Sequence, residues 1–236
     1  MPSPAHQTSI TIDGITIAVT YKRMKTITLR VRTPSADVVV SAPLRTPAVV
    51  LTAFIEQKIP WIRSHQQRIL ARAATHTPDL SDDGTVRVWG TRMPLTVATA
   101  TRRSIRLHAD TVILTHPAES GAAERQALVD VLYRRLVAAA LPTLVERWSA
   151  VMQVHVNKTF VQKMKTRWGS CNYRAHHIRL NSELASYPPQ CLEYVVIHEL
   201  VHLLEASHNQ RFYALMTQFY PDWKAIRALL RNGTEC

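Results

Sequence analysis

The stretch His198-Glu199-Leu200-Val201-His202 determines how this sequence is interpreted. Two histidines four residues apart lie on one face of a helix, about 6 Å apart along its axis. Both imidazoles can therefore reach one metal ion, and zinc is a metal that commonly binds such a pair. Glu199 projects one helical step away, so its carboxylate can hold a water molecule instead of the metal. The pattern predicts an HExxH helix that binds a metal and activates water.

The residues around this stretch predict that its helix is buried. Apolar side chains surround the helix nearly completely between residues 192 and 204: Val195, Val196, Ile197, Leu200, Val201, Leu203 and Leu204. Burying two imidazoles and a carboxylate is costly unless they have partners, and a metal ion with its water would supply them. The alternative is a structural helix whose histidines are hydrogen-bonded within the core.

The expected third ligand is His208. On a continuous helix it would lie about 9 Å further along the axis than His202, so it reaches the metal only if the chain turns after Leu204. Ser207 begins a capping-box pattern that would open a new helix after such a turn. Glu205 is the alternative ligand, although three residues past His202 it would still lie on the first helix.

Composition indicates a globular protein inside the cell. The chain has 236 residues, of which 46% are hydrophobic, which suits one large or two small domains. Its first residues lack the basic and apolar regions of a signal peptide, and no apolar run is long enough to cross a bilayer. Cys171, Cys191 and Cys236 are too few and too scattered for a disulfide framework. These features predict a cytoplasmic protein with no membrane partner.

The chain is strongly basic, with a formal net charge of +12. Residues 1–120 carry 15 basic and 8 acidic side chains, and residues 121–236 carry 14 and 9, so the charge is not confined to a tail. Such a balance favours an anionic partner, whether nucleic acid, nucleotide or acidic peptide. A solvated basic surface without a partner is the alternative. The sequence does not indicate the oligomeric state.

Hydrophobic periodicity predicts an α+β fold in two parts. Residues 1–120 should form a β-rich region with a helical insertion near 47–74, and Asp13-Gly14 between two alternating runs predicts a β-hairpin. Residues 121–236 should form a zincin-like α+β domain that holds the HExxH helix.

Two of the predicted helices contain a proline that should interrupt them. Pro60 is expected to end one helix of the N-terminal region and to start another. In the C-terminal part, the long alanine-rich helix between Glu124 and Met152 should break at Pro142.

A basic segment precedes the HExxH helix. If the residues from Lys158 to Trp168 form one strand, alternation puts Lys163, Lys165 and Arg167 on one face with Val161. The other face would carry Phe160, Gln162, Met164, Thr166 and Trp168. The basic face predicts an anion-binding wall beside the metal, because Lys and Arg bind phosphate and carboxylate groups. The alternative is the solvated face of a half-buried strand.

Four further residues near the site have expected roles. Gly169 would permit a tight bend or a close backbone approach, and Cys171 is expected to be a small buried residue rather than a ligand or reactive thiol. Asn181 would orient a backbone group or a ligand, with a local turn contact as the alternative. Asp222 would either orient a ligand imidazole from behind or cap the last helix.

These motifs together resemble a known family. The YgjP-like metallohydrolases carry similar versions of Arg167-Trp-Gly-Ser-Cys, Leu180-Asn181, Pro188-Pro189, Tyr194-Val-Val-Ile-His-Glu-Leu-Val-His and His208-x-x-x-Phe212. That family is described as zinc metallopeptidase-like and is related in layout to SprT-like and minimal zincin proteins. The resemblance extends over most of the chain. It implies that His198, His202 and His208 bind one zinc ion and that Glu199 is the catalytic carboxylate.

The expected chemistry is hydrolysis by an activated water. Zinc would lower the pKa of a bound water toward about 7, and Glu199 would accept its proton during attack. A further electrophile should stabilise the developing charge. The sequence offers several candidates for this role without ranking them: Arg167, His176, His177 and Tyr213.

Three functions are compatible with these residues. The first is a zinc peptidase in which an edge strand holds an extended peptide. The second is a metal-dependent nucleoside triphosphate pyrophosphatase, since some members of the resembling family have been linked to triphosphate hydrolysis, notably of UTP; Lys163, Lys165 and Arg167 would then meet the triphosphate. The third is a basic nucleic-acid-associated protein with a structural metal, or a protease guided by nucleic acid. Glu199 argues against a purely structural metal, because a closed site has four protein ligands and needs no adjacent carboxylate.

Overall fold

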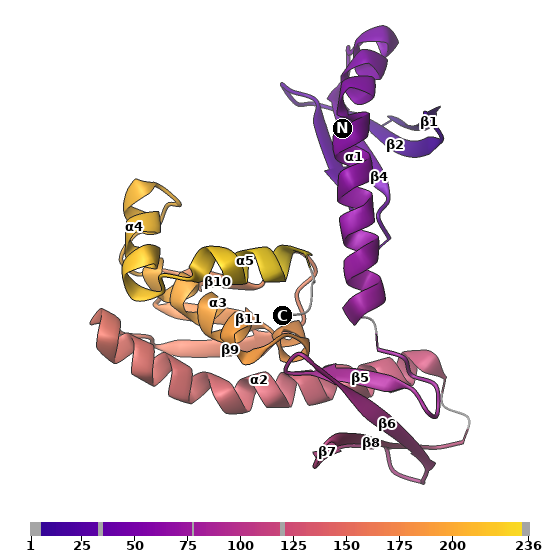
Figure 1. Cartoon of the computed structure of the whole chain (residues 1–236). Helices are drawn as coiled ribbons and strands as arrows, with labels where there is room; N and C mark the ends of the chain where they lie inside the picture. Colours follow the sequence, from indigo (N-terminus) through magenta and orange to yellow (C-terminus); the bar gives the residue numbers. More distant parts are fainter. Residues whose placement is uncertain (1–5, 33–34, 77, 119–120, 233–236) are drawn as a thin grey trace. The chain divides into compact units, whose positions relative to one another are not determined.

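The computed structural model of the protein describes residues 6–32, 35–76, 78–118 and 121–232; Cys236 lies outside them. The chain divides into two compact units, Met1–Thr75 and His76–Cys236, which are described in turn with the labels of Figure 1. Within the described ranges, no helix combines the length and the apolar character that a bilayer-crossing segment requires. The predicted mixed α+β architecture with a β-rich N-terminal region is confirmed.

The first unit is a four-stranded sheet followed by one long helix. Its elements are β1 (His6–Ile12), β2 (Ile15–Lys22), β3 (Thr28–Val31), β4 (Val38–Pro43) and α1 (Ala48–His76). The strand order is β1-β2-β4-β3, with β2 and β4 parallel and the other pairs antiparallel. Asp13 and Gly14 join β1 to β2 with φ values of 51° and 74°, the left-handed conformation that a two-residue hairpin turn requires. The predicted hairpin is therefore confirmed.

The predicted helix breaks at Pro60 and Pro142 are wrong. α1 continues through Pro60, and the long helix α2 (Ala122–Met152) continues through Pro142. A proline inside a helix costs about 3 kcal/mol, but both prolines are exposed and both helices are held by buried side chains on either side. In α1, Ile55 and Ile62 are fully buried, and burying one such side chain contributes about 1.5–3 kcal/mol. Packing therefore outweighs the lost backbone hydrogen bond.

The second unit contains two sheets and four α-helices among its described residues. The first sheet contains β5 (Thr85–Val88), β6 (Thr91–Thr99), β7 (Ser104–His108) and β8 (Thr111–His116) in the order β5-β6-β8-β7. After α2 come β9 (Lys158–Gln162), β10 (Gly169–Asn172), β11 (His177–Asn181), the 3-10 helix η1 (Ser182–Ser186), α3 (Pro189–Val201), α4 (Gln210–Phe219) and α5 (Trp223–Asn232). Figure 1 shows α2 extending from β7 and β8 to β9.

One hydrophobic core joins both sheets of this unit. Residues of β5 and β8 share it with residues of α2 and α3, and hydrogen bonds reinforce the connection. The Tyr133 hydroxyl of α2 donates to the carbonyl of Arg87 at 2.8 Å, and the backbone N–H of Trp89 donates to the carbonyl of Ala185 at 2.7 Å. The boundary that the sequence suggested near residue 120 therefore lies inside this unit, and the structural division falls at residues 75 and 76.

The predicted single strand from Lys158 to Trp168 is wrong. β9 ends at Gln162 and β10 begins at Gly169, and both strands belong to a three-stranded sheet in the order β10-β11-β9. Because β9 runs parallel to β11 and β10 runs antiparallel to it, the chain must reverse direction between them. Residues 163–168 form that connection, so the strict alternation expected of a strand does not apply to them.

Asn181 holds this connection in place. Its side-chain oxygen accepts a hydrogen bond from the N–H of Met164 at 3.2 Å, and its side-chain nitrogen donates to the carbonyls of Met164 and Arg167 at 2.9 and 3.0 Å. The same oxygen accepts from the N–H of Glu183 at the start of η1. Asn181 is 2% exposed, and an unpaired amide at such a position would be costly. Asn181 thus orients backbone groups, as expected, and these groups belong to the residues that connect β9 to β10.

Candidate metal centre

The candidate metal centre is built on α3, whose sequence favours a buried helix. Pro188 is its N-cap and Pro189 occupies the first turn, where the missing N–H of proline has no cost and its fixed φ suits the helix. Most of the helix is buried, and Val196, Ile197 and Leu200 have no exposed surface. The expectation of a buried helix is therefore observed. Rigid surroundings of this kind fix the directions in which the polar side chains of α3 project.

His198, His202 and His208 converge at the end of α3. Among the described residues they form a group whose potential ligand atoms all lie within 4.8 Å of one another. The Nε2 atoms of His198 and His208 are 3.1 Å apart. Two nitrogen ligands of one tetrahedral zinc ion, each about 2.0–2.1 Å from the metal, would lie about 3.3 Å apart. The three residues therefore fit a single zinc ion.

A turn brings His208 to the other two histidines. α3 ends at Val201, whose carbonyl accepts hydrogen bonds from the N–H groups of Leu204 and Glu205. The turn thus begins one helical turn earlier than expected. The new helix α4 is capped by Asn209, whose side chain accepts from the N–H of Phe212 at 3.0 Å, and not by Ser207. His208 directly precedes this cap, so the start of α4 fixes its position.

Glu205 contacts the histidine cluster through its backbone carbonyl and not through its carboxylate. Its backbone carbonyl lies 3.2 Å from Nδ1 of His202. Because a carbonyl can only accept, Nδ1 carries the proton in this hydrogen bond and Nε2 keeps its lone pair for a metal. The Glu205 carboxylate accepts from the N–H of Ser207 instead. Among the described residues, the acid expected as the alternative third ligand therefore shapes the turn.

Phe212 packs against all three imidazoles. Its ring centroid lies 5.0, 4.7 and 4.6 Å from those of His198, His202 and His208, and its side chain is fully buried. Burial lowers the pKa of His198 to about 3, with smaller contributions from His202, His208 and Arg227. Burial also lowers the pKa of His202. The neutral imidazole, which is the form that binds metals, is therefore favoured at neutral pH.

Glu199 lies beside this cluster against β10. It is 4% exposed, and burial raises its pKa to about 8, while Arg167 acts in the opposite direction. A Cβ atom added to Gly169 would lie 2.5 Å from Oε1 of Glu199. Only glycine leaves room for the carboxyl group at this position, so the close approach considered for Gly169 is observed. The same contact places Glu199 at the first residue of β10.

Residues 163–168 are not part of a strand, so the strand face on which Lys163, Lys165 and Arg167 were expected to form a wall is not present. The ammonium group of Lys163 lies 2.9 Å from both carboxylate oxygens of Asp130 and 3.9 Å from Glu183, so its charge is already paired. Lys165 and Arg167 are exposed, and Arg167 is close enough to Glu199 to influence its pKa. Of the three cations, only Arg167 thus has an electrostatic connection to the metal centre.

Asp222 and the histidines of the β10–β11 turn have other contacts. The backbone carbonyl of Asp222 accepts from the N–H groups of Ala225 and Ile226 at the start of α5, and no described contact joins its carboxylate to an imidazole ligand. His176 donates from Nδ1 to the carbonyl of His155 at 2.9 Å. Among the remaining candidates for an electrophile, Tyr213 lies near the cluster, with its ring 6.4 Å from that of His208.

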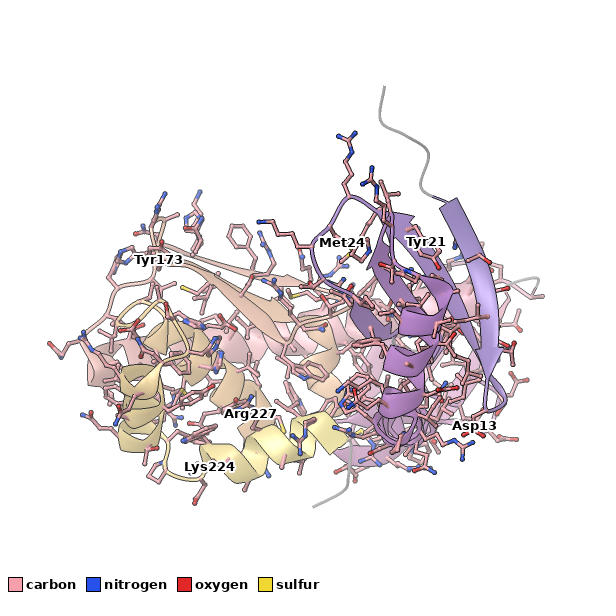
Figure 2. The ribbon with its side chains drawn as sticks, turned by 90° about the horizontal axis from the view of Figure 1, so that it is seen from above. Asp13, Tyr21, Met24, Tyr173, Lys224 and Arg227 are labelled. Atoms are coloured by element: carbon pink, nitrogen blue, oxygen red, sulfur yellow. The ribbon has the colours of Figure 1, made fainter. Side chains whose placement is uncertain are left out.

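Two residues near the cluster were missed by the sequence reasoning. The ring of Tyr194 lies 5.9 Å from that of His198, and burial raises the pKa of its hydroxyl to about 12, so it remains a neutral donor. Arg227 of α5, labelled in Figure 2, contributes to the lowered pKa of His198. Tyr194 has helical i, i+4 spacing to His198 and could have been found. Arg227 reaches the site from another helix, which no local spacing indicates.

Comparison with known proteins gives a family match. The model of the YgjP-like metallopeptidase domain matches residues 25–233. Two crystal structures of metallopeptidase zymogens are similar to part of the chain, jannalysin of Methanocaldococcus jannaschii and abylysin of Pyrococcus abyssi, each with 18% identity. The match to jannalysin covers 37% of this chain and 90% of that one, with a TM-score of 0.33, and the match to abylysin covers 39% and 95%, with a TM-score of 0.35. No curated protein matches the chain.

Proposed function

The chain belongs to the YgjP-like metallopeptidase-domain family, and we propose that it is a zinc peptidase whose metal is held by His198, His202 and His208. The observation that carries this proposal is the convergence of three imidazoles beside one buried carboxylate, Glu199. Three protein ligands leave a tetrahedral zinc ion with one open position, as in catalytic rather than structural sites. A bound zinc ion supplies a Lewis acid that polarises a carbonyl group and makes water nucleophilic near neutral pH.

Glu199 is the proposed general base. Its position on α3, one residue from His198, directs its carboxyl group to the side of the ligands rather than to the ion itself. A general base works best when its pKa is near the working pH, and burial moves the pKa of Glu199 upward from the usual range of a glutamate. Glu199 would take a proton from the attacking water and deliver it to the leaving amine.

β10 is the proposed substrate-binding strand. It lies at the edge of its sheet, so its outer backbone groups can pair with an extended peptide. Its first residue, Gly169, contacts Glu199, which would bring a peptide paired with β10 to the base. In the nucleotide alternative, the predicted basic wall would have met the triphosphate. Since Lys163 is paired with Asp130, no observation at this site favours a triphosphate over a peptide.

The test is a comparison of wild-type protein with Glu199→Gln on a library of unstructured peptides, with metal content measured by mass spectrometry. We expect about one zinc per chain in both proteins and a loss of about 10²–10⁴-fold in peptide hydrolysis in the variant, the range typical of general acid–base catalysis. Glu146→Gln is the matched control, because Glu146 is an exposed acid on α2.

Two results would contradict the proposal. Full peptidase activity in Glu199→Gln would show that Glu199 is not the base. Nucleoside triphosphates should be assayed with the same preparations, and Glu199-dependent triphosphate hydrolysis in the absence of any peptide hydrolysis would assign the site to the nucleotide reaction instead.

A further inference from the structure

We propose that the outer face of the β9–β11–β10 sheet binds single-stranded nucleic acid. The outer sheet face is defined by residues on the side of the sheet away from α3: Lys158, Phe160, Ser170, Asn172, His177 and Arg179. At one end, Tyr173 and Arg174 in the turn after β10 border it, and Figure 2 shows Tyr173 at this end of the strands. This proposal does not depend on the proposed peptidase activity.

The strand register establishes which side chains share this face. Phe160 pairs with Arg179 across β9 and β11, and Arg179 pairs with Ser170 across β11 and β10. Residues paired across neighbouring strands project to the same side. Ile178 and Leu180, which alternate with Arg179, are fully buried, so the opposite side of the sheet faces the core. Phe160 and Arg179 therefore face outward.

The outer sheet face carries an uncompensated positive charge. A hollow of about 380 Å³ opens on it and is lined by Phe160, Tyr173, Arg174, His177 and Arg179 among others. None of the residues that line this hollow is acidic, and neither arginine has an ion-pair partner among the described residues. The buried Nε of Arg179 also has no hydrogen-bond partner there. A hollow with these properties favours an anionic ligand.

Exposed aromatic rings distinguish the expected ligand from other anions. Phe160 is 39% exposed and Tyr173 is 48% exposed, although burial of either ring would be favourable. The guanidinium of Arg179 lies 5.2 Å from the centre of the Phe160 ring, and that of Arg174 lies 5.9 Å from Tyr173. Aromatic rings and guanidinium planes on a sheet are the surfaces on which unpaired bases stack, while arginines bind the phosphates.

Other anionic partners fit these features less well. An acidic peptide would use the arginines but would have no need of two exposed rings. A nucleic-acid duplex keeps its bases stacked inside, whereas a single strand presents their faces. The observations therefore favour a short single-stranded stretch, with phosphates at Arg174 and Arg179 and bases on Phe160 and Tyr173.

The experiment is fluorescence anisotropy with labelled single-stranded RNA and DNA oligonucleotides about 12 nucleotides long, within the site sizes typical of such surfaces. Wild-type protein should bind, and its affinity should fall steeply as salt is added. The double variants Arg174→Ala/Arg179→Ala and Phe160→Ala/Tyr173→Ala should each weaken binding about tenfold or more. Thermal unfolding would establish that each variant folds, which is expected for the aromatic variant because Phe160 is 39% and Tyr173 48% exposed.

The matched control is Arg106→Ala/Arg135→Ala, which removes two exposed arginines of the same unit outside the outer sheet face. We expect this control to change affinity by less than about twofold, because the overall charge contributes only through screened, long-range attraction. Glu199→Gln should bind like wild type, which separates this proposal from the proposed peptidase activity. Absence of binding by wild type at low salt would overturn the proposal, as would equal weakening by the control. Efficient competition by polyglutamate, with no effect of the aromatic double variant, would assign the face to acidic peptides instead.

Discussion

The metal centre and the connecting segment 163–168 are close to each other but are held in different ways. The three histidines of the candidate metal centre project from α3 and from the turn after it, where backbone hydrogen bonds and a fully buried Phe212 fix them. The connecting segment has no strand or helix of its own and is held chiefly by the side chain of Asn181. The difference shows that charged residues act together only when a rigid element aligns them, and Lys163 has instead formed an ion pair with Asp130.

Among the substitutions considered, the loss of one proposed zinc ligand should give the largest effect, a loss of zinc affinity. We expect His208→Ala to lower zinc affinity by more than about 100-fold, because removing a partner behind a ligand already costs about 10–100-fold and His208 would be a ligand itself. The measurement is zinc titration against a competing chelator. The fold should be retained, since His208 is exposed.

Glu205→Ala is the control for that experiment, because Glu205 was the alternative ligand. Its backbone carbonyl, which accepts from His202, is kept in the variant. Zinc affinity should therefore stay within about tenfold of wild type, below the loss expected for a ligand. If Glu205→Ala lost zinc while His208→Ala kept it, the assignment of the third ligand would be reversed.

The next effect tests the contact between Glu199 and β10. In Gly169→Ala, the new methyl group would lie 2.5 Å from Oε1 of Glu199, so the carboxyl group has to move. A displacement of about 1 Å in a catalytic group can cost about 10²-fold in rate. We expect such a loss in kcat with an unchanged zinc content, because the methyl group meets Glu199 and not the imidazoles. Normal activity would show that the base tolerates displacement.

The clustering of the three histidines could be predicted because its geometry is local. The spacing of His198 and His202 on a helix needs no tertiary information, and the turn that delivers His208 lies within the next six residues. The exact helix end and the Asn209 cap could not be distinguished from Ser207, because both residues are good caps. Arg227 could not be predicted, because only tertiary packing brings α5 to His198.

The sheet beside the metal centre was less predictable because its geometry is not local. An alternating pattern from Lys158 to Trp168 fits one strand, but it contains no information on the parallel pairing of β9 with β11. That pairing forces the reversal after Gln162 and turns Phe160 outward. The prolines at positions 60 and 142 also show that local sequence does not reveal tertiary packing. Proline prefers to end a helix, but burial of other side chains in each helix overrides that preference.

The smallest effect is expected for Lys163→Ala, and it separates the two regions. The side chain of Lys163 is 43% exposed in its pair with Asp130, and such pairs contribute about 0.2–1 kcal/mol to stability. We therefore expect a slightly lower free energy of unfolding in urea and unchanged kcat and KM for peptide hydrolysis. An increase in KM would show instead that Lys163 leaves Asp130 to bind substrate. In that case, the segment would belong to the catalytic surface despite its lack of regular structure.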